Sequence, residues 1–145
     1  MDVDSLTLEH LSRDECLQLL ASVPIGRIVY TRQALPAVEL VNFSLLDGDI
    51  VIKTDARAKL AAATSGAVVA FQADSTDVAE HVGWSVTILG YARAVIDSDE
   101  IHDLEQITPT SWVPERPNHF IRISPTIVHG RRLGAPQSRD GSYSR

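Results

Sequence analysis

A chain of 145 residues is long enough for one domain with a buried core and too short for two. Its composition, 44% hydrophobic and 22% charged, excludes a fully disordered protein. Its formal net charge of −6 provides no basic footprint for nucleic acid or for an anionic membrane surface, so a small-molecule partner fits better. The single cysteine, Cys16, allows neither an intramolecular disulfide nor a multi-cysteine metal site within one chain.

The N-terminal segment MDVDSLTLEHLSRDE lacks both a basic n-region and an apolar h-region. No apolar run approaches the ~20 residues of a membrane span. We therefore expect a cytoplasmic protein without a membrane partner.

Three local signals define the expected elements. Ser12, followed three residues later by Glu15, is a capping-box pattern that starts a helix. The Asp47-Gly48 pair between two runs of strand formers predicts a hairpin turn, and Gly90 inside the longest such run predicts a bulge or bend. In chain order, we expect a helix at Arg13–Ala21, strands at Gly26–Thr31, Ala37–Leu45 and Ile50–Thr54, a short helix at Ala56–Ala63, strands at Ala67–Ala73 and Gly83–Ile96, a helix at Asp99–Gln106, and strands at His119–Ile123 and Ile127–Leu133.

About six strands with two or three short helices, and no regular βαβ alternation, argue against a doubly wound fold. We expect a mainly β protein, an antiparallel barrel with peripheral helices. One domain should span residues 1–133. The tail 134–145 has little to bury and should be mobile.

A basic cluster stands at the junction between a predicted strand and the short helix after it. Lys53, Thr54, Arg57 and Lys59 would place cationic and hydroxyl groups beside the backbone N–H groups of a helix start, an arrangement that suits a phosphate. The same residues also fit a solvated turn with ordinary surface cations.

The remaining polar residues form no hydrolase or nucleotide motif: the sequence contains no G-x-S-x-G, H-E-x-x-H, P-loop or G-x-G-x-x-G. Asp74 and Asp77, with Glu80 nearby, are expected in an acidic loop that could hold a cation, and a solvated loop is the favoured interpretation. No two histidines have metal-ligand spacing on one predicted element, so we expect no metal site and assign these residues to surface or packing roles: His10, His81, His102, His119 and His129.

Both tryptophans stand where a site could form. Trp84 opens the longest predicted strand and fits either the core or a site. Trp112 lies in a proline-braced segment, where its indole would cover its own loop or contact a dimer partner or cofactor.

Five segments together resemble the pyridoxamine 5′-phosphate oxidase-like, FMN-binding split-barrel family. They are Gly26-Arg27-Ile28, Val41-Asn42-Phe43, DGDIVIKT followed by the RAKL helix, GWSVTILGYARAV and HFIRISPTIVHGRRL. The resemblance runs from about Leu11 to Leu133.

This resemblance implies a six-stranded antiparallel Greek-key split barrel that forms a homodimer, with two flavin sites at the subunit interface. It assigns the flavin phosphate to Lys53, Thr54, Arg57 and Lys59. It assigns the edge of the isoalloxazine ring to Val41, Asn42 and Phe43. Ser85 matches a position where vitamin-B6 oxidases carry a glutamine that contacts the flavin, and Trp112 and Arg131-Arg132 would approach from the other subunit.

The implied function is that of an FMN-dependent oxidoreductase acting on an unknown small organic molecule, because a flavin brings its own redox reactivity. The chain lacks a counterpart of the longer C-terminal segment that vitamin-B6 oxidases use on their substrate, so we do not expect pyridoxamine phosphate oxidation. A deazaflavin or haem as the ligand, and a binding or storage role without rapid turnover, remain alternatives.

Overall fold

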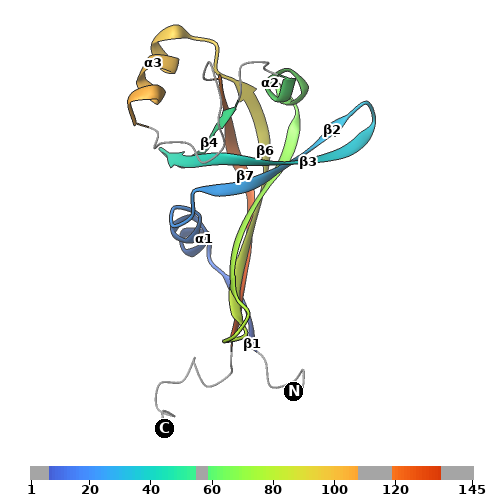
Figure 1. Ribbon diagram of the computed structural model, residues 1–145, viewed down its shortest axis with the longest axis vertical. Coiled ribbons are helices and arrows are strands. Elements are labelled where there is room, and N and C mark those ends of the chain that lie inside the picture. Colours follow the sequence, from blue (N-terminus) through green and yellow to red (C-terminus); the bar gives the residue numbers. More distant parts are fainter. Residues whose placement is uncertain (1–6, 55–58, 108–118, 135–145) are drawn as a thin grey trace.

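The computed structural model describes residues 7–54, 59–107 and 119–134 (Figure 1). In this part of the chain, seven strands and three helices follow one another. They are β1 (Thr7–Leu11), α1 (Arg13–Leu20), β2 (Ile25–Arg32), β3 (Leu35–Leu46), β4 (Asp49–Thr54), α2 (Lys59–Thr64), β5 (Val68–Asp77), β6 (Val82–Ala94), α3 (Ser98–Ile107) and β7 (His119–Gly134). None of these helices is long and apolar enough to cross a membrane.

The strands form an antiparallel barrel that β7 closes. Six strands pair in the order β7-β4-β3-β2-β5-β6, and β6 pairs again with β7, which completes the ring. This confirms the expected six-stranded barrel. A seventh strand, β1, pairs along the last residues of β7, from Thr7 opposite Gly134 to Leu11 opposite Gly130. The sequence analysis missed β1 because its five residues, TLEHL, carry no turn signal and depend on this pairing.

The prediction of two separate strands around Pro125 was wrong, because β7 runs unbroken from His119 to Gly134. Pro125 lies opposite Gly90, where the register between β6 and β7 shifts. A proline is tolerated in a strand at such an irregularity because the ladder hydrogen bonds are already interrupted there. The predicted bulge at Gly90 is confirmed: a Cβ atom on this residue would lie 2.0 Å from the carbonyl oxygen of Ser124.

Two tight turns build the hairpins on either side of β3. Asp47 and Gly48 have φ values of 53° and 82°, so the predicted turn between β3 and β4 is confirmed as one with two left-handed residues. Gln33 and Ala34, between β2 and β3, adopt the same conformation with φ values of 52° and 65°. Neither residue favours this region, which explains why the sequence did not reveal this hairpin.

The helix starts agree with the sequence. The Ser12 hydroxyl accepts from the Glu15 N–H at 3.2 Å, and the Glu15 carboxylate accepts from the Ser12 N–H at 2.8 Å, which completes the capping box of α1. Asp97 caps α3 by accepting from the Glu100 N–H at 3.0 Å. Strand β5 is longer than predicted and ends at Asp77, so the interpretation of Asp74 and Asp77 as a loop was wrong.

Side chains fill the barrel interior. The rings of Phe43 and Phe71 meet edge to face with centroids 4.7 Å apart, and a Cβ on Gly26 would lie 2.4 Å from the Phe71 ring. A second small core lies under α3 on the outside of the barrel, made by Val51, Val95, Leu104 and Phe120. The barrel is therefore packed, and a ligand of flavin size must bind outside it.

A network of ion pairs fastens α3 to the barrel wall. Glu100 accepts from Arg93 at 2.9 Å and from Arg122 at 3.1 Å, and Arg122 also bonds Asp49 at 2.9 Å. The hydrogen bonds from Arg93, with the charge of Arg122, hold the pKa of the Glu100 carboxyl below its ordinary value. Only 13% of the Arg122 side chain is exposed, so this network is less screened than a surface pair.

We predict that Glu100→Gln lowers the free energy of unfolding at pH 7 by about 1–2 kcal/mol. The carboxylate has a lowered pKa in the folded state, so its stabilisation is complete above the unfolded-state pKa of about 4.3 and is lost as pH falls through the folded value. The difference between the two proteins should therefore shrink below about pH 4 in urea unfolding curves. Glu80→Gln, in the exposed turn between β5 and β6, is the control and should unfold like the parent. A pH-independent loss in Glu100→Gln would contradict the role of its charge.

Candidate functional site

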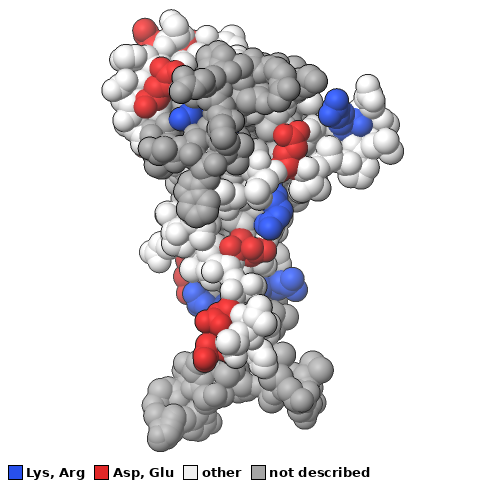
Figure 2. Space-filling view, viewed as in Figure 1, with Lys and Arg blue, Asp and Glu red and all other residues white. Residues whose placement is uncertain are grey.

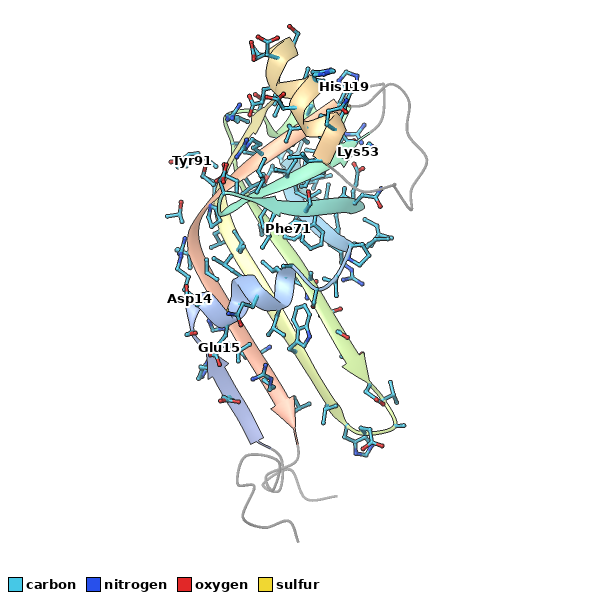
Figure 3. All side chains as sticks on the ribbon, turned by 90° about the vertical axis from the view of Figure 1, so that its left-hand side faces the viewer. Asp14, Glu15, Lys53, Phe71, Tyr91 and His119 are labelled. Atoms are coloured by element: carbon cyan, nitrogen blue, oxygen red, sulfur yellow. The ribbon has the colours of Figure 1, made fainter. Side chains whose placement is uncertain are left out.

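An apolar row crosses the outer face of the barrel. We use this name for Val38, Val29, Ala70, Leu89 and Ile127, which lie opposite one another in that order across β3, β2, β5, β6 and β7. Val38 is 60% exposed, Leu89 38% and Ile127 55%. The next pair on the same face, Val68 and Tyr91, extends this surface. Figure 3 shows Tyr91 on the outside of the barrel. A contiguous apolar surface of this kind marks an interaction site.

A polar group lies on the same outer face at one end of the barrel. Asn42 on β3 is opposite Lys53 on β4, so both side chains leave the sheet on the same side. Figure 3 shows Lys53 and His119 at the end of the barrel that carries α3. Thr54 follows Lys53 at the end of β4, is buried and, since strand residues alternate, leaves β4 on the side opposite to Lys53. Lys59 is the first residue of α2. Arg57 lies outside the described residues. The structure thus places three of the four predicted phosphate residues at one strand end and the start of the next helix.

Val41 and Phe43, predicted beside the flavin ring, belong to the barrel core. Their side chains leave the strand on the opposite side from Asn42, since strand residues alternate. The N–H of Phe43 donates to the carbonyl of Pro24 at 3.1 Å. Asn42 is therefore the one residue of the three whose side chain leaves the sheet on the outer face.

A pocket of about 560 Å³ lies at the hairpin between β5 and β6, beside the first residues of β6 and the last residues of β7. Ser85 on β6 is opposite Arg131 on β7, and both line the pocket. Trp84 packs against the barrel core, as one of its two predicted roles requires, and it also lines this pocket, so its role in a site stays a prediction. The remaining walls come from the hairpin and from the end of β7: Asp74, Thr76, Asp77, Val78, His81, Val82, Gly83 and Leu133.

A chain of hydrogen bonds joins this pocket to the middle of the outer face. Arg27 donates to Gln72 at 3.2 Å, and Gln72 donates to Asp74 at 3.1 Å. Arg27 and Asp74 also form an ion pair at 3.8 Å. The Asp74 carboxylate is therefore already compensated, and Arg131 has no carboxylate partner among the described residues. The guanidinium of Arg131 is available to an anionic or hydrogen-bonding ligand.

The two polar groups lie far apart in one chain. Lys53 is opposite Phe120, and Ser85 is opposite Arg131, so β7 separates them by eleven residues. Along an extended strand, eleven residues span up to about 35 Å. One small ligand in one chain cannot touch both.

The charges do not create a strong field on the face shown in Figure 2, where acidic and basic side chains alternate. Attraction of a charged ligand must therefore come from individual groups such as Lys53 and Arg131. Cys16 offers no alternative chemistry, because burial raises the pKa of its thiol and it packs under Gly130.

Several features of this surface were missed by the sequence analysis. The hydrogen-bonded chain from Arg27 to Asp74 and the apolar row depend on register between strands that are distant in the sequence. The sequence predicted that the strand Ala67–Ala73 ends before Asp74, whereas β5 extends to Asp77. This extension forms the β5–β6 hairpin that lines the pocket, so the pocket could not be predicted from the shorter strand. Trp112 lies outside the described residues, so its predicted contact stays a prediction.

The chain matches known proteins over most of its length. Residues 12–132 match the family model described as pyridoxamine 5′-phosphate oxidase. The uncharacterized protein Rv0080 of Mycobacterium tuberculosis is 38% identical over 130 residues, which cover 86% of this chain and 85% of that protein.

Solved structures agree with this match. A FAD binding protein from Mycobacterium smegmatis is 34% identical with a TM-score of 0.71, covering 86% of this chain and 97% of that one. A conserved protein of unknown function from Corynebacterium diphtheriae is 27% identical with a TM-score of 0.70, covering 88% and 98%. A FAD and haem binding protein from Mycobacterium smegmatis shares the fold, at 14% identity and a TM-score of 0.65, over 90% of this chain and 73% of that one.

Proposed function

Because this chain belongs to the pyridoxamine 5′-phosphate oxidase family, whose model matches residues 12–132, we propose that it is an FMN-binding oxidoreductase acting on a small organic molecule. One observation carries the proposal: two ligand-competent polar groups flank an exposed apolar row on the outside of a packed barrel. Neither group is complete alone, and each offers a cation that no described carboxylate neutralises.

The separation of the two groups supports a homodimer. Since Lys53 and Arg131 cannot reach one ligand within a chain, the site would combine Lys53 of one subunit with Ser85 and Arg131 of its partner. The apolar row lies between the two groups on the outer face and supplies the apolar surface that homodimer interfaces bury. A two-fold axis would then produce two equivalent sites.

Within such a site, this chain's residues would bind and orient the ligand. Lys53 and Thr54, with Arg57 and Lys59, would hold the phosphate, and Asn42 would reach the ring from the same strand pair. Ser85 and Arg131 would supply a hydroxyl and a guanidinium at the ring edge, with Trp112 beside them. A bound flavin supplies the electron-transfer chemistry. Apolar walls such as Val82 and Leu133 would exclude water from the pocket.

A second candidate ligand is FAD, favoured by the 34% identity to a protein described as FAD binding. Both nucleotides carry a phosphate on the ribityl chain, so the role of Lys53 is the same for either. Deazaflavin or haem binding, and storage without rapid turnover, are the further alternatives. Absorption spectra and the mass of the molecule that co-purifies distinguish among these ligands.

We predict that Lys53→Ala weakens FMN binding by about tenfold or more, because a charge-assisted contact to phosphate contributes roughly 1.5–3 kcal/mol. Riboflavin, which has the same ring and no phosphate, should bind the variant and the parent alike. Fluorescence titration with both ligands measures the effect. Arg13→Ala, which removes an exposed cation from α1, is the control and should change neither affinity. Equal weakening of both ligands would show that Lys53 does not contact phosphate.

We predict that Leu89→Lys places a charge in the centre of the apolar row, weakens dimerisation by about tenfold or more and releases the flavin. Ile96→Lys is the matched control, because Ile96 is 87% exposed and does not belong to the row. Analytical ultracentrifugation and the flavin absorbance of both variants provide the measurement. A Leu89→Lys protein that remains dimeric, or a monomeric parent with full flavin content, would refute the proposed interface.

The activity itself is tested by steady-state and single-turnover kinetics. We expect the bound flavin to be reduced by a nicotinamide or similar donor and reoxidised by a small organic acceptor. Turnover of pyridoxamine 5′-phosphate with oxygen on the order of 1 per second or faster would instead identify a vitamin-B6 oxidase. A flavin that is reduced by no donor would favour the storage role.

A further inference from the structure

The two histidines His10 and His129 meet on the surface of neighbouring strands. Their ring centroids are 5.8 Å apart and their planes are tilted by 53°. Leu11 on β1 is opposite Gly130 on β7, and both turn toward Cys16 of α1. His10 and His129 precede these two residues and leave the sheet on the opposite side, where both are exposed.

This spacing fits two imidazoles bound to one small ion. An imidazole nitrogen binds zinc at about 2.0–2.1 Å, which places the ring centroid about 3.2 Å from the metal. Two rings on a tetrahedral ion then have centroids about 5 Å apart, and rings on opposite sides of the ion about 6.4 Å. The observed 5.8 Å lies between these limits, so the spacing of the two rings is compatible with one shared ion.

We propose that His10 and His129 form a binding site for one borderline divalent transition-metal ion. Neutral imidazole suits Zn²⁺, Ni²⁺ and Cu²⁺, and Cu²⁺ should bind most tightly of the three by the Irving–Williams order. Among the described residues, no group of three histidine, cysteine or acidic side chains could hold a metal. The pair therefore supplies two ligands, and water fills the open positions.

The surroundings decide how tightly the ion binds. The ladder between β1 and β7 fixes both Cα positions, so little backbone order is lost when the ion binds. Arg131 lies opposite His10 in the same register, and its charge opposes a cation. Arg131 also lines the pocket beside β6, which His10 does not. We expect an affinity in the micromolar range, weaker than that of a four-ligand structural site.

The bound ion would fasten the edge strand β1 to β7. On the other face, β1 is held by the ion pair between Glu9 and Arg132, which is long at 3.8 Å and about 40% exposed on both sides. Such a pair contributes little stability. A metal bridge between His10 and His129 binds only when β1 is paired, so it stabilises the folded chain by mass action.

Calorimetric titration of the untagged, full-length protein with ZnCl₂ tests the site. We expect one equivalent to bind, and His10→Ala and His129→Ala each to weaken this binding by about tenfold or more. His102→Ala, which removes an exposed histidine from α3, should bind like the parent. Saturating Zn²⁺ should also raise the melting temperature of the parent by several degrees and leave both pair variants unchanged.

Each other outcome overturns the proposal. No Zn²⁺ binding by the parent, unchanged binding in either pair variant, or equal loss in His102→Ala would show that the pair is not a chelate. If inorganic phosphate, and not Zn²⁺, raises the melting temperature of the parent but not of the His10→Ala and His129→Ala variants, the histidine pair is an anion site and the proposal is wrong. Circular dichroism of the variants establishes that they are folded, and the flavin content, which the proposal does not involve, should equal that of the parent.

Discussion

The close approach of β6 to β7 at Gly90 is the constraint on which the architecture depends. Strand β7 pairs with β4 over its first five residues, with β6 over most of its length, and with β1 at its end. The register between β6 and β7 shifts where Gly90 faces Pro125, and there the backbone of Gly90 lies close to the carbonyl of Ser124. Any side chain at Gly90 would push the two strands apart and open the barrel.

Because the barrel is closed and its interior is packed, a ligand has to bind to the outer face. Phe43, Phe71 and their neighbours fill the barrel core, so the exposed side chains on the outer surface are the ones that can meet a ligand of flavin size. There the register places an apolar row between a polar group at Lys53 and another at Arg131. The proposed dimer follows from this arrangement, because two copies related by a two-fold axis would bury the row and bring unlike ends together.

The end of β7 serves several roles at once. Its outer face carries His129 beside the edge strand and Arg131 beside the pocket, while Gly130 between them admits Cys16 of α1. Alternation of side chains along the strand separates Gly130 from the other two residues, whereas His129 and Arg131 share the outer face and differ in the strand that lies beside them. The proposed metal site and the proposed flavin site therefore use neighbouring residues of one strand without sharing a ligand.

Local chemistry in the sequence determined much of this protein. The Ser12 capping box, the Asp47-Gly48 turn and the Gly90 bulge are set by residues within a few positions of one another, so the predicted elements there were confirmed. The family resemblance from about Leu11 to Leu133 then predicted the barrel and the family, and the match of the family model to residues 12–132 confirms the family. The same local reasoning placed Lys53 and Thr54 together at one strand end, because they are neighbours in the chain.

Only the tertiary structure decided what depends on pairing between distant segments. Strand β1 exists because β7 offers it a ladder, and the Gln33-Ala34 turn adopts left-handed geometry because β2 and β3 pair around it. The apolar row and the meeting of His10 with His129 likewise follow from register, which brings together residues that are distant in the sequence. No local pattern encodes such contacts, because their energy comes from partners that the chain supplies elsewhere.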